Sequence, residues 1–226
     1  MSAKSAWINF ILLKAIFLLP GFGSHAQTVE DSNKEIYKSI KIDKQVWMAE
    51  NLNLGNFRNG DTIPEAKTNE EWISAGKEGK AAWCYYENKI DNGVSYGRLY
   101  NWYAVTDTHG LAPKGWHVPT DAEWRQVTLY LGGEDAAGTK MKTPAGWTLD
   151  GNGTNESGFS GLPGGSRNRN GEFDYTGHIA YWWCSTPYDP DFAWYRVIDE
   201  SPYYVYRTYY YKQNGYSVRC IKDQGN

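Results

Sequence analysis

A helix-start signal at residues 118–124 is the sequence feature that most limits how this chain can fold. Thr120 can accept a hydrogen bond from the backbone N–H of Glu123, and the Glu123 carboxylate can accept one from the N–H of Thr120, which together form a capping box. The apolar residues that follow recur at helical spacing and end at paired glycines: Trp124, Val127, Leu131, Gly132 and Gly133. We therefore predict a short helix over residues 120–131 with one apolar face, which must pack against other elements.

Residues 1–26 carry the pattern of a secretory signal peptide. Lys4 precedes an apolar run over residues 8–19, and residues 24–26 precede the expected cleavage. The alternative is a short membrane anchor, but Lys14 leaves far fewer uninterrupted apolar residues than the ~20 that a span needs. We expect an exported protein, located in the periplasm, on the cell surface or outside the cell, with no integral membrane span.

The length of 226 residues fits a signal peptide followed by one domain. We assign residues 27–38 to a flexible lead-in, residues 39–223 to the domain and residues 224–226 to a tail. The formal net charge is −3 and no run of Lys or Arg occurs. Nucleic acid is therefore not expected as a partner, because its phosphates require a basic surface.

The aromatic content is unusual, with 11 Trp and 18 Tyr against 7 Phe. Tyr and Trp combine an apolar body with a polar tip, which suits surfaces that contact a ligand. The alternative is that a loop-rich domain uses these residues to build its core. The composition alone leaves both interpretations open.

Hydrophobic periodicity predicts an α+β domain in which helices come first and an antiparallel, loop-rich sheet follows. Thr68 repeats the capping pattern of Thr120 and is expected to start a helix that ends at Gly76. Further helices are expected over residues 96–105 and 135–142, and a polar turn over residues 88–93. A hairpin is expected at residues 40–48, and strands over residues 81–86, 180–185, 193–198, 203–211 and 216–222.

Several motifs occur in an order that resembles the Fibrobacter succinogenes major paralogous domain, a family of exported bacterial domains of uncharacterised activity. These motifs include Trp47 with Asn51, Tyr96 with Gly97, and the opening Gly115-Trp116-His117. Together they occupy residues 45–52, 83–86, 96–105, 115–120, 155–159, 162–165 and 215–220. The resemblance covers about residues 40–223.

A more distant resemblance is to the sulfatase-modifying, formylglycine-generating group. The helix start at residues 118–124, the Trp-Trp-Cys-Ser segment at residues 182–185 and the closing residues 215–220 are similar to motifs of that group. This resemblance implies a C-type-lectin-like fold, in which the helices at Tyr96 and Thr120 pack on a small twisted sheet. The later strands would then present a binding surface.

The sequence offers only weak signals for a catalytic site. The formylglycine-generating enzymes use a thiolate pair before the last strand, but residues 203–215 contain no cysteine, and only a thiolate can supply that chemistry. The three later histidines form no metal-binding spacing: His109, His117 and His178. We expect a protein that is not an enzyme.

A structural calcium ion is the one cofactor that the sequence suggests. Its candidate ligands are the oxygen-bearing side chains of a glycine-rich loop, namely Asp150, Asn152, Asn155 and Glu156. The spacing does not follow the EF-hand pattern, and the sugar-binding calcium motifs of the lectins are absent. A turn held by Asn and Ser side chains is the alternative interpretation.

The C-terminal run at residues 203–211 is the best candidate for a binding surface. Strand alternation places Tyr204, Tyr206 and Tyr210 on one face, and Arg207 with Tyr209 on the other. We expect one face to be core and the other to expose tyrosines, which is typical of sugar- and protein-binding surfaces. Cross-strand aromatic pairs that cover a thin sheet are the alternative. The candidate ligand-binding residues are Trp194, Tyr195, Tyr204, Tyr206, Arg207, Tyr209 and Tyr210.

The three cysteines, Cys84, Cys184 and Cys220, are too far apart for a CxxC motif. Export permits one bridge and one free thiol. Cys84 and Cys220 fall in motifs that match the family, and the lectin-like fold places its first and last strands side by side. The resemblance therefore implies a Cys84–Cys220 disulfide, with Cys184 free and buried beside Trp183.

Taken together, these features predict an exported, non-catalytic binding domain that recognises a carbohydrate or a protein through its aromatic C-terminal face. The first alternative is a structural or adhesive cell-surface component that acts by protein–protein assembly. A formylglycine-generating type of oxidase is the third and is disfavoured by the missing thiolate pair.

Overall fold

A computed structural model of the chain describes residues 27–30, 36–201 and 203–224. The predicted signal peptide at residues 1–26 lies outside the described residues, as do residues 225 and 226 of the predicted tail. No helix in the described ranges is long and apolar enough to cross a membrane.

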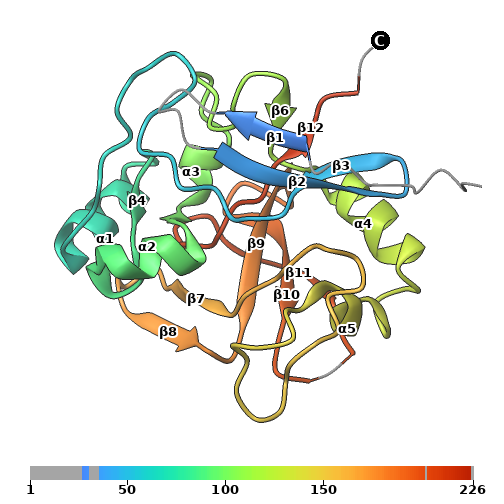
Figure 1. The fold of residues 1–226 in the computed structure, drawn as a ribbon. Helices are drawn as coiled ribbons and strands as arrows, with labels where there is room; N and C mark the ends of the chain where they lie inside the picture. Colours follow the sequence, from blue (N-terminus) through green and yellow to red (C-terminus); the bar gives the residue numbers. More distant parts are fainter. Residues whose placement is uncertain (1–26, 31–35, 202, 225–226) are drawn as a thin grey trace, which may run out of the picture.

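The domain is α+β and contains several small antiparallel sheets (Figure 1). Its helical elements are α1 (Asn69–Lys77), the 3-10 turn η1 (Tyr86–Asn88), α2 (Ile90–Tyr96), α3 (Trp102–Val105), α4 (Asp121–Tyr130) and α5 (Ala137–Met141). Its strands are β1 (Gln27–Glu30), β2 (Ile36–Ile42), β3 (Gln45–Met48), β4 (Trp83–Cys84), β5 (Leu99–Tyr100), β6 (Trp116–His117), β7 (Gly164–Arg167), β8 (Phe173–Thr176), β9 (Ala180–Pro187), β10 (Phe192–Ile198), β11 (Tyr206–Tyr211) and β12 (Ile221–Lys222).

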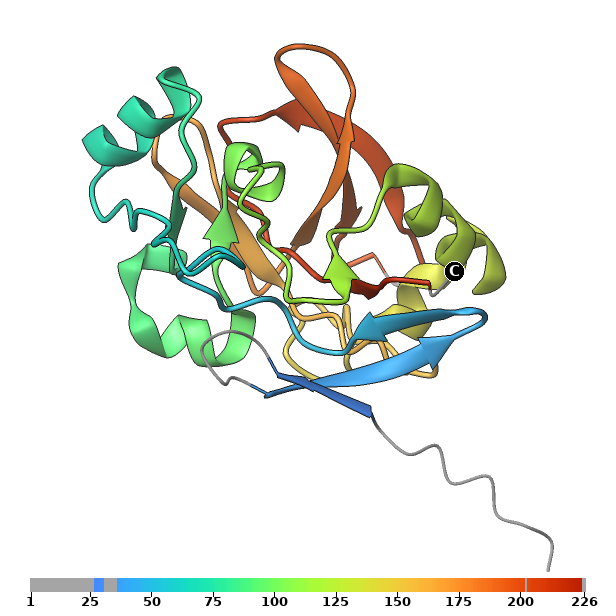
Figure 2. The same ribbon diagram turned by 90° about the horizontal axis from the view of Figure 1, so that it is seen from above.

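A five-stranded antiparallel sheet joins the two ends of the domain, in the order β1-β2-β3-β12-β6. Ile221 of the last strand pairs with Trp47 of β3 and with His117 of β6. The prediction that an antiparallel sheet follows the helices holds for β7 to β11 but not for this sheet, in which the first strands and the last strand lie together (Figure 2). The lead-in expected at residues 27–38 contains β1 and the start of β2.

A second sheet, in the order β11-β10-β9, lies between α1 and α2 at one end of the molecule and α4 and α5 at the other (Figure 1). Alternation along β9 sends neighbouring residues into two different hydrophobic clusters. Trp183 belongs to one cluster with Tyr195 and Tyr216, whereas Trp182 and Cys184 belong to the other. The sheet therefore separates two cores and is buried on both faces at β9.

Helix α4 forms as its sequence predicts. The Thr120 side chain accepts from the N–H of Glu123 at 3.2 Å, and the Glu123 carboxylate accepts from the N–H of Thr120 at 2.8 Å. Gly132 and Gly133 follow the helix with φ of 112° and 92°, values that favour glycine. Trp124 is fully buried between Trp47 of the first sheet and Trp182 of the second.

The helix predicted over residues 96–105 is wrong in its bounds. α2 occupies most of the expected polar turn and ends at Tyr96, and the next residue, Gly97, has a φ of 72°. A Cβ at Gly97 would lie 2.7 Å from the carbonyl oxygen of Leu52, so only glycine fits there. Asn101 then caps the one-turn helix α3 by accepting from the N–H of Ala104. Aromatic residues at helical spacing therefore lie on a short strand and a separate turn.

The disulfide implied by the resemblance is not formed. Cys84, Cys184 and Cys220 are all free and buried. Each lies in a different hydrophobic cluster. Cys84 is on β4, whereas Cys220 directly precedes β12 of the five-stranded sheet. Burial raises the pKa of Cys84 and of Cys184 to about 12, so both stay protonated thiols. The prediction that Cys184 is free and buried is confirmed, although its side chain faces away from Trp183.

Candidate functional site

Six side chains on one face of β10, β11 and the preceding turn form a continuous surface that we call the aromatic face. The antiparallel register places Trp194 opposite Tyr209, and Phe192 opposite Tyr211. Directly opposed residues of an antiparallel pair share a face, so these four rings lie together. The remaining members are Tyr188 and Arg207.

The rings of the aromatic face hold one another in fixed positions. Tyr188 and Tyr209 stack with ring centroids 3.6 Å apart and planes at 4°. Trp194 meets both in edge contacts, at 5.1 and 5.5 Å. Phe192 continues the row by contacting Tyr209 at 5.9 Å and Tyr211 at 4.5 Å. Tyr188 and Tyr209 are nevertheless 45% and 40% exposed, so the row remains available to solvent.

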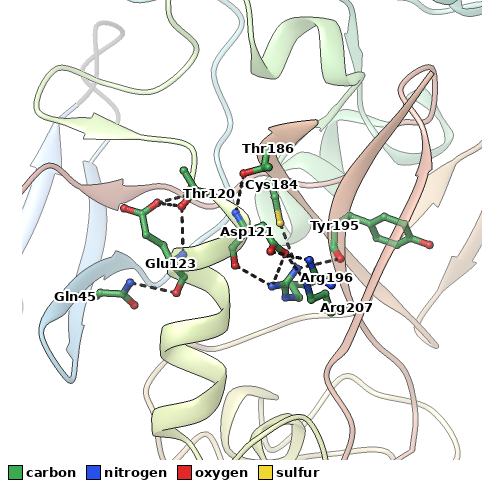
Figure 3. A network of polar contacts seen from close by, with 9 residues as sticks. All are labelled: Gln45, Thr120, Asp121, Glu123, Cys184, Thr186, Tyr195, Arg196 and Arg207. Atoms are coloured by element: carbon green, nitrogen blue, oxygen red, sulfur yellow. Dashed lines mark hydrogen bonds and ion pairs between the residues drawn. The ribbon is translucent and has the colours of Figure 1, made fainter. Parts of the chain in front are cut away.

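Arg207 closes one end of this row. Its guanidinium lies 3.5 Å from the ring centroid of Trp194, the geometry of a cation–π contact. The same guanidinium donates to both carboxylate oxygens of Asp121, at 2.8 and 3.0 Å (Figure 3). Such a two-point contact fixes the plane of the arginine. Helix α4 therefore orients a side chain of the aromatic face.

Asp121 also pairs with Arg196, which is 1% exposed. One carboxylate thus serves two guanidinium groups (Figure 3). Burial alone would raise the pKa of Asp121, but the hydrogen bond from Arg207 and the charge of Arg196 outweigh it, and the pKa is lowered. Asp121 is therefore ionised at neutral pH, and the network keeps one excess positive charge beside the aromatic face.

A small pocket of about 130 Å³ adjoins this network on the α4 side. It is lined by Arg125, Thr128, Leu129, Glu134 and Arg196. The Thr128 hydroxyl is buried and has no hydrogen-bond partner among the described residues. The pocket therefore offers charged and hydroxyl groups beside Arg196 of the Asp121 network.

The structure brings together only some of the residues that the sequence proposed. Trp194, Arg207 and Tyr209 belong to the aromatic face. Tyr210 lies on the opposite side of β11, and Tyr195 is only 8% exposed and contacts Trp183 and Tyr216 in a core. Figure 3 shows the Tyr195 ring pointing away from the Asp121 network. Tyr204 and Tyr206 stack on each other at 5.5 Å near the start of the strand.

Neither face of β11 is core, contrary to the expectation that one would be. Tyr206, Tyr209 and Tyr210 are about equally exposed, at 40–45%. β11 is the outer strand of its sheet and pairs only with β10 within the described part of the chain. An edge strand has fewer neighbours to cover it, which explains the exposure on both faces.

Sequence reasoning missed Tyr188, Phe192 and Asp121 as members of the site. Tyr188 lies in the turn between β9 and β10, where its N–H donates to the Phe192 carbonyl at 3.0 Å. Alternation in residues 192–198 already places Phe192 and Trp194 on one face and was the signal available. Nothing local indicates Asp121, because its partner Arg207 is 86 positions away.

The calcium candidates lie in a turn held by side chains. The Asn152 side-chain oxygen accepts from the N–H of Trp147 at 3.1 Å, and that of Asn155 accepts from the N–H of Ser160 at 2.7 Å. In the described ranges, no group of three or more His, Cys, Asp or Glu residues is arranged to hold a metal ion. The calcium site, with Asp150 and Glu156, stays a prediction.

His117 lies between two carboxylates that come from distant parts of the chain. Its Nε2 is 2.9 Å from Glu123 of α4 and its Nδ1 is 2.6 Å from Asp223, which follows β12. The hydrogen bond with Glu123 raises the pKa of His117; burial opposes this, and Asp223 adds to it. The imidazolium thus ties the C-terminal strand to the helix cap.

We expect His117 to make the stability of the domain depend on pH. Because the pKa of His117 is raised in the folded state, protonated His117 stabilises the folded domain. This stabilisation is fully present below the ordinary pKa near 6.5 and is lost as pH rises through the raised pKa. The free energy of unfolding should therefore fall over this window in the wild type but not in His117→Gln. Urea unfolding between about pH 6 and 9 measures the difference. Asp223→Asn should reduce the effect, and a wild type that parallels His117→Gln across the window would contradict it.

A family model described as the Fibrobacter succinogenes major domain matches residues 40–222. The matched residues run from β2 to β12 and include the aromatic face and the Asp121 network. Neither the curated proteins nor the solved structures contain a match to this chain.

Proposed function

The chain belongs to the Fibrobacter succinogenes major domain family, and we propose that it is an exported, non-catalytic binding domain that holds a carbohydrate chain on its aromatic face. The proposal rests above all on one observation. Arg207 is fixed by Asp121 and stacks on Trp194, at the end of a row of rings that includes the exposed Tyr188 and Tyr209.

The chemistry of this row suits a sugar. The apolar faces of sugar rings pack on aromatic rings, while tyrosine hydroxyls and arginine N–H groups bond the sugar hydroxyls. The rings are already ordered by their own contacts, so binding loses little side-chain entropy. The pocket beside Arg196 adds polar partners for hydroxyls that project from the row.

A protein partner is the second candidate, and the outer edge of β11 favours it. Within the described part of the chain this strand pairs on one side only. An unpaired edge can add a strand from another chain, and exposed tyrosines are common at protein interfaces. In this case the domain is a structural or adhesive component that acts by assembly.

Binding to an array of plant and bacterial polysaccharides tests the proposal. Tyr188→Ala and Tyr209→Ala should each weaken binding to the retained polysaccharide about tenfold or more, the effect of losing ~1.4 kcal/mol. Tyr130→Ala removes a similarly exposed tyrosine from α4, outside the aromatic face, and should leave the affinity unchanged. Equal losses in all three variants, or binding to protein partners alone, would reject the carbohydrate proposal.

A further inference from the structure

A cleft separate from the aromatic face lies between β2, the segment after β3, and α2. Its volume of about 620 Å³ is in the usual range for small-molecule sites. The charged and polar residues of its wall include Lys38, Glu50, Asn51, Ser95, Ser160 and Arg219. These residues come from five separate parts of the chain, which the fold brings to one place.

Arg219 is the unusual member of this wall because its charge is buried without a counter-ion. The side chain is 2% exposed, and within the described residues no carboxylate forms an ion pair with it. Its guanidinium donates to two oxygen atoms, the amide oxygen of Asn51 at 2.8 and 3.2 Å and the Phe159 carbonyl. A buried cation held only by neutral groups is destabilised. Burial accordingly lowers the pKa of Arg219 to about 9, and Glu50 opposes this only partly.

Arg167 shows what a fully satisfied buried arginine looks like in the same molecule. It is 0% exposed, and its guanidinium donates to four oxygens, those of Ala66, Thr68, Asn69 and Gly171. Arg219 donates to only two, although a guanidinium carries five N–H donors. Arg219 thus keeps donor capacity as well as charge next to an open cleft.

The other charged groups of the wall leave the cleft positive. Lys38 and Glu50 lie 3.9 Å apart, are 73% and 45% exposed, and offset each other. The net positive charge of the wall therefore comes from Arg219. In addition, the amide oxygen of Asn53 in the wall is buried without a hydrogen-bond partner among the described residues, and it could accept a bond from an O–H or N–H group.

We propose that this cleft binds a small oxyanion, a carboxylate- or phosphate-bearing molecule, with Arg219 supplying the counter-charge. The anion would accept hydrogen bonds from the N–H groups of the Arg219 guanidinium that Asn51 and Phe159 do not use. Asn51 is held in place by its own bond to the Tyr96 carbonyl at 2.9 Å, so the arginine is already oriented. This site is independent of the aromatic face and of its ligand.

Calorimetric titration of the full chain at constant ionic strength tests the site, with glucuronate and inorganic phosphate as probes and glucose as the neutral control. Saturable binding of glucuronate or of phosphate, and not of glucose, is expected, and the probe that binds more tightly identifies the anion. Lys38→Glu should weaken binding about tenfold, because it reverses a charge in the wall. Lys41→Glu makes the same change at an exposed site on β2 outside the cleft and should shift the affinity by less than about twofold.

Glu50→Gln tests the proposal through an expected gain in affinity. It removes the negative charge that faces the anion and should tighten anion binding severalfold. All three variants change exposed side chains, and circular dichroism checks that each is folded. The proposal is overturned if neither anion binds saturably, if Lys38→Glu and Lys41→Glu have equal effects, or if Glu50→Gln weakens binding.

Discussion

Asp121→Ala is expected to lower the free energy of unfolding by about 3–5 kcal/mol, because it leaves the buried guanidinium of Arg196 without its carboxylate. Arg196 is 1% exposed, and its remaining contacts are the Asp121 carbonyl at 3.1 Å and two contacts of 3.5 Å to Cys184 and Tyr195. None of these compensates a full charge. Urea unfolding monitored by tryptophan fluorescence measures the loss.

Two matched variants separate the buried charge from other effects of this change. Glu78→Gln removes one partner of the exposed Lys80–Glu78 pair and should change stability little. The double variant Asp121→Leu/Arg196→Met replaces the buried pair by apolar side chains and should be more stable than Asp121→Ala alone. A double variant that is less stable than Asp121→Ala would show that the loss does not come from the stranded arginine.

The parts of the fold that the sequence predicted well depend on neighbouring residues. Both capping boxes form, at Thr68 and at Thr120, and the hairpin turns at Asp43 with a φ of 54°. A cap joins residues three positions apart, and a hairpin joins strands that follow each other. Each can therefore be inferred from a short window of sequence.

The parts that failed depend on contacts between distant residues. Nothing near Ile221 indicates that it pairs with Trp47, 174 positions earlier, and this pairing decides the five-stranded sheet. The free cysteines are a similar case. The family resemblance placed two of them on neighbouring strands, whereas the structure puts Cys84 in a small cluster with Trp72 and Leu99. Pairing of cysteines needs their positions in space, which spacing in the sequence does not supply.

The sequence predicted which residues of the candidate site share a face, but not which of them are exposed, because exposure depends on distant parts of the chain. Alternation along the tyrosine-rich strand correctly separated Tyr209 from Tyr210. It did not say whether either face is covered, because exposure depends on where the strand lies in its sheet. Tyr195 is on the central strand and is buried, while the tyrosines of the edge strand β11 are exposed on both sides.

Trp124→Ala is the second variant expected to have a large effect, because Trp124 joins the two sheets through one aromatic cluster. The centroid of its ring lies 4.8 Å from that of Trp47, 5.7 Å from that of Phe159 and 6.1 Å from that of Trp182. Removing a fully buried tryptophan leaves a cavity and should lower the free energy of unfolding by about 3–5 kcal/mol. That loss is a large share of the roughly 5–15 kcal/mol that holds a domain folded.

Trp124→Phe should lower the free energy of unfolding by less than the size of the removed ring suggests. The Trp124 indole N–H is buried and has no partner among the described residues, so phenylalanine removes an unsatisfied donor together with part of the apolar area. Leu129→Ala, at a 67% exposed position on the same helix, controls for changes in helix propensity and should be nearly neutral. If Trp124→Phe were as damaging as Trp124→Ala, the indole N–H would have to be bonded, and the helix would be fixed by that bond rather than by ring packing.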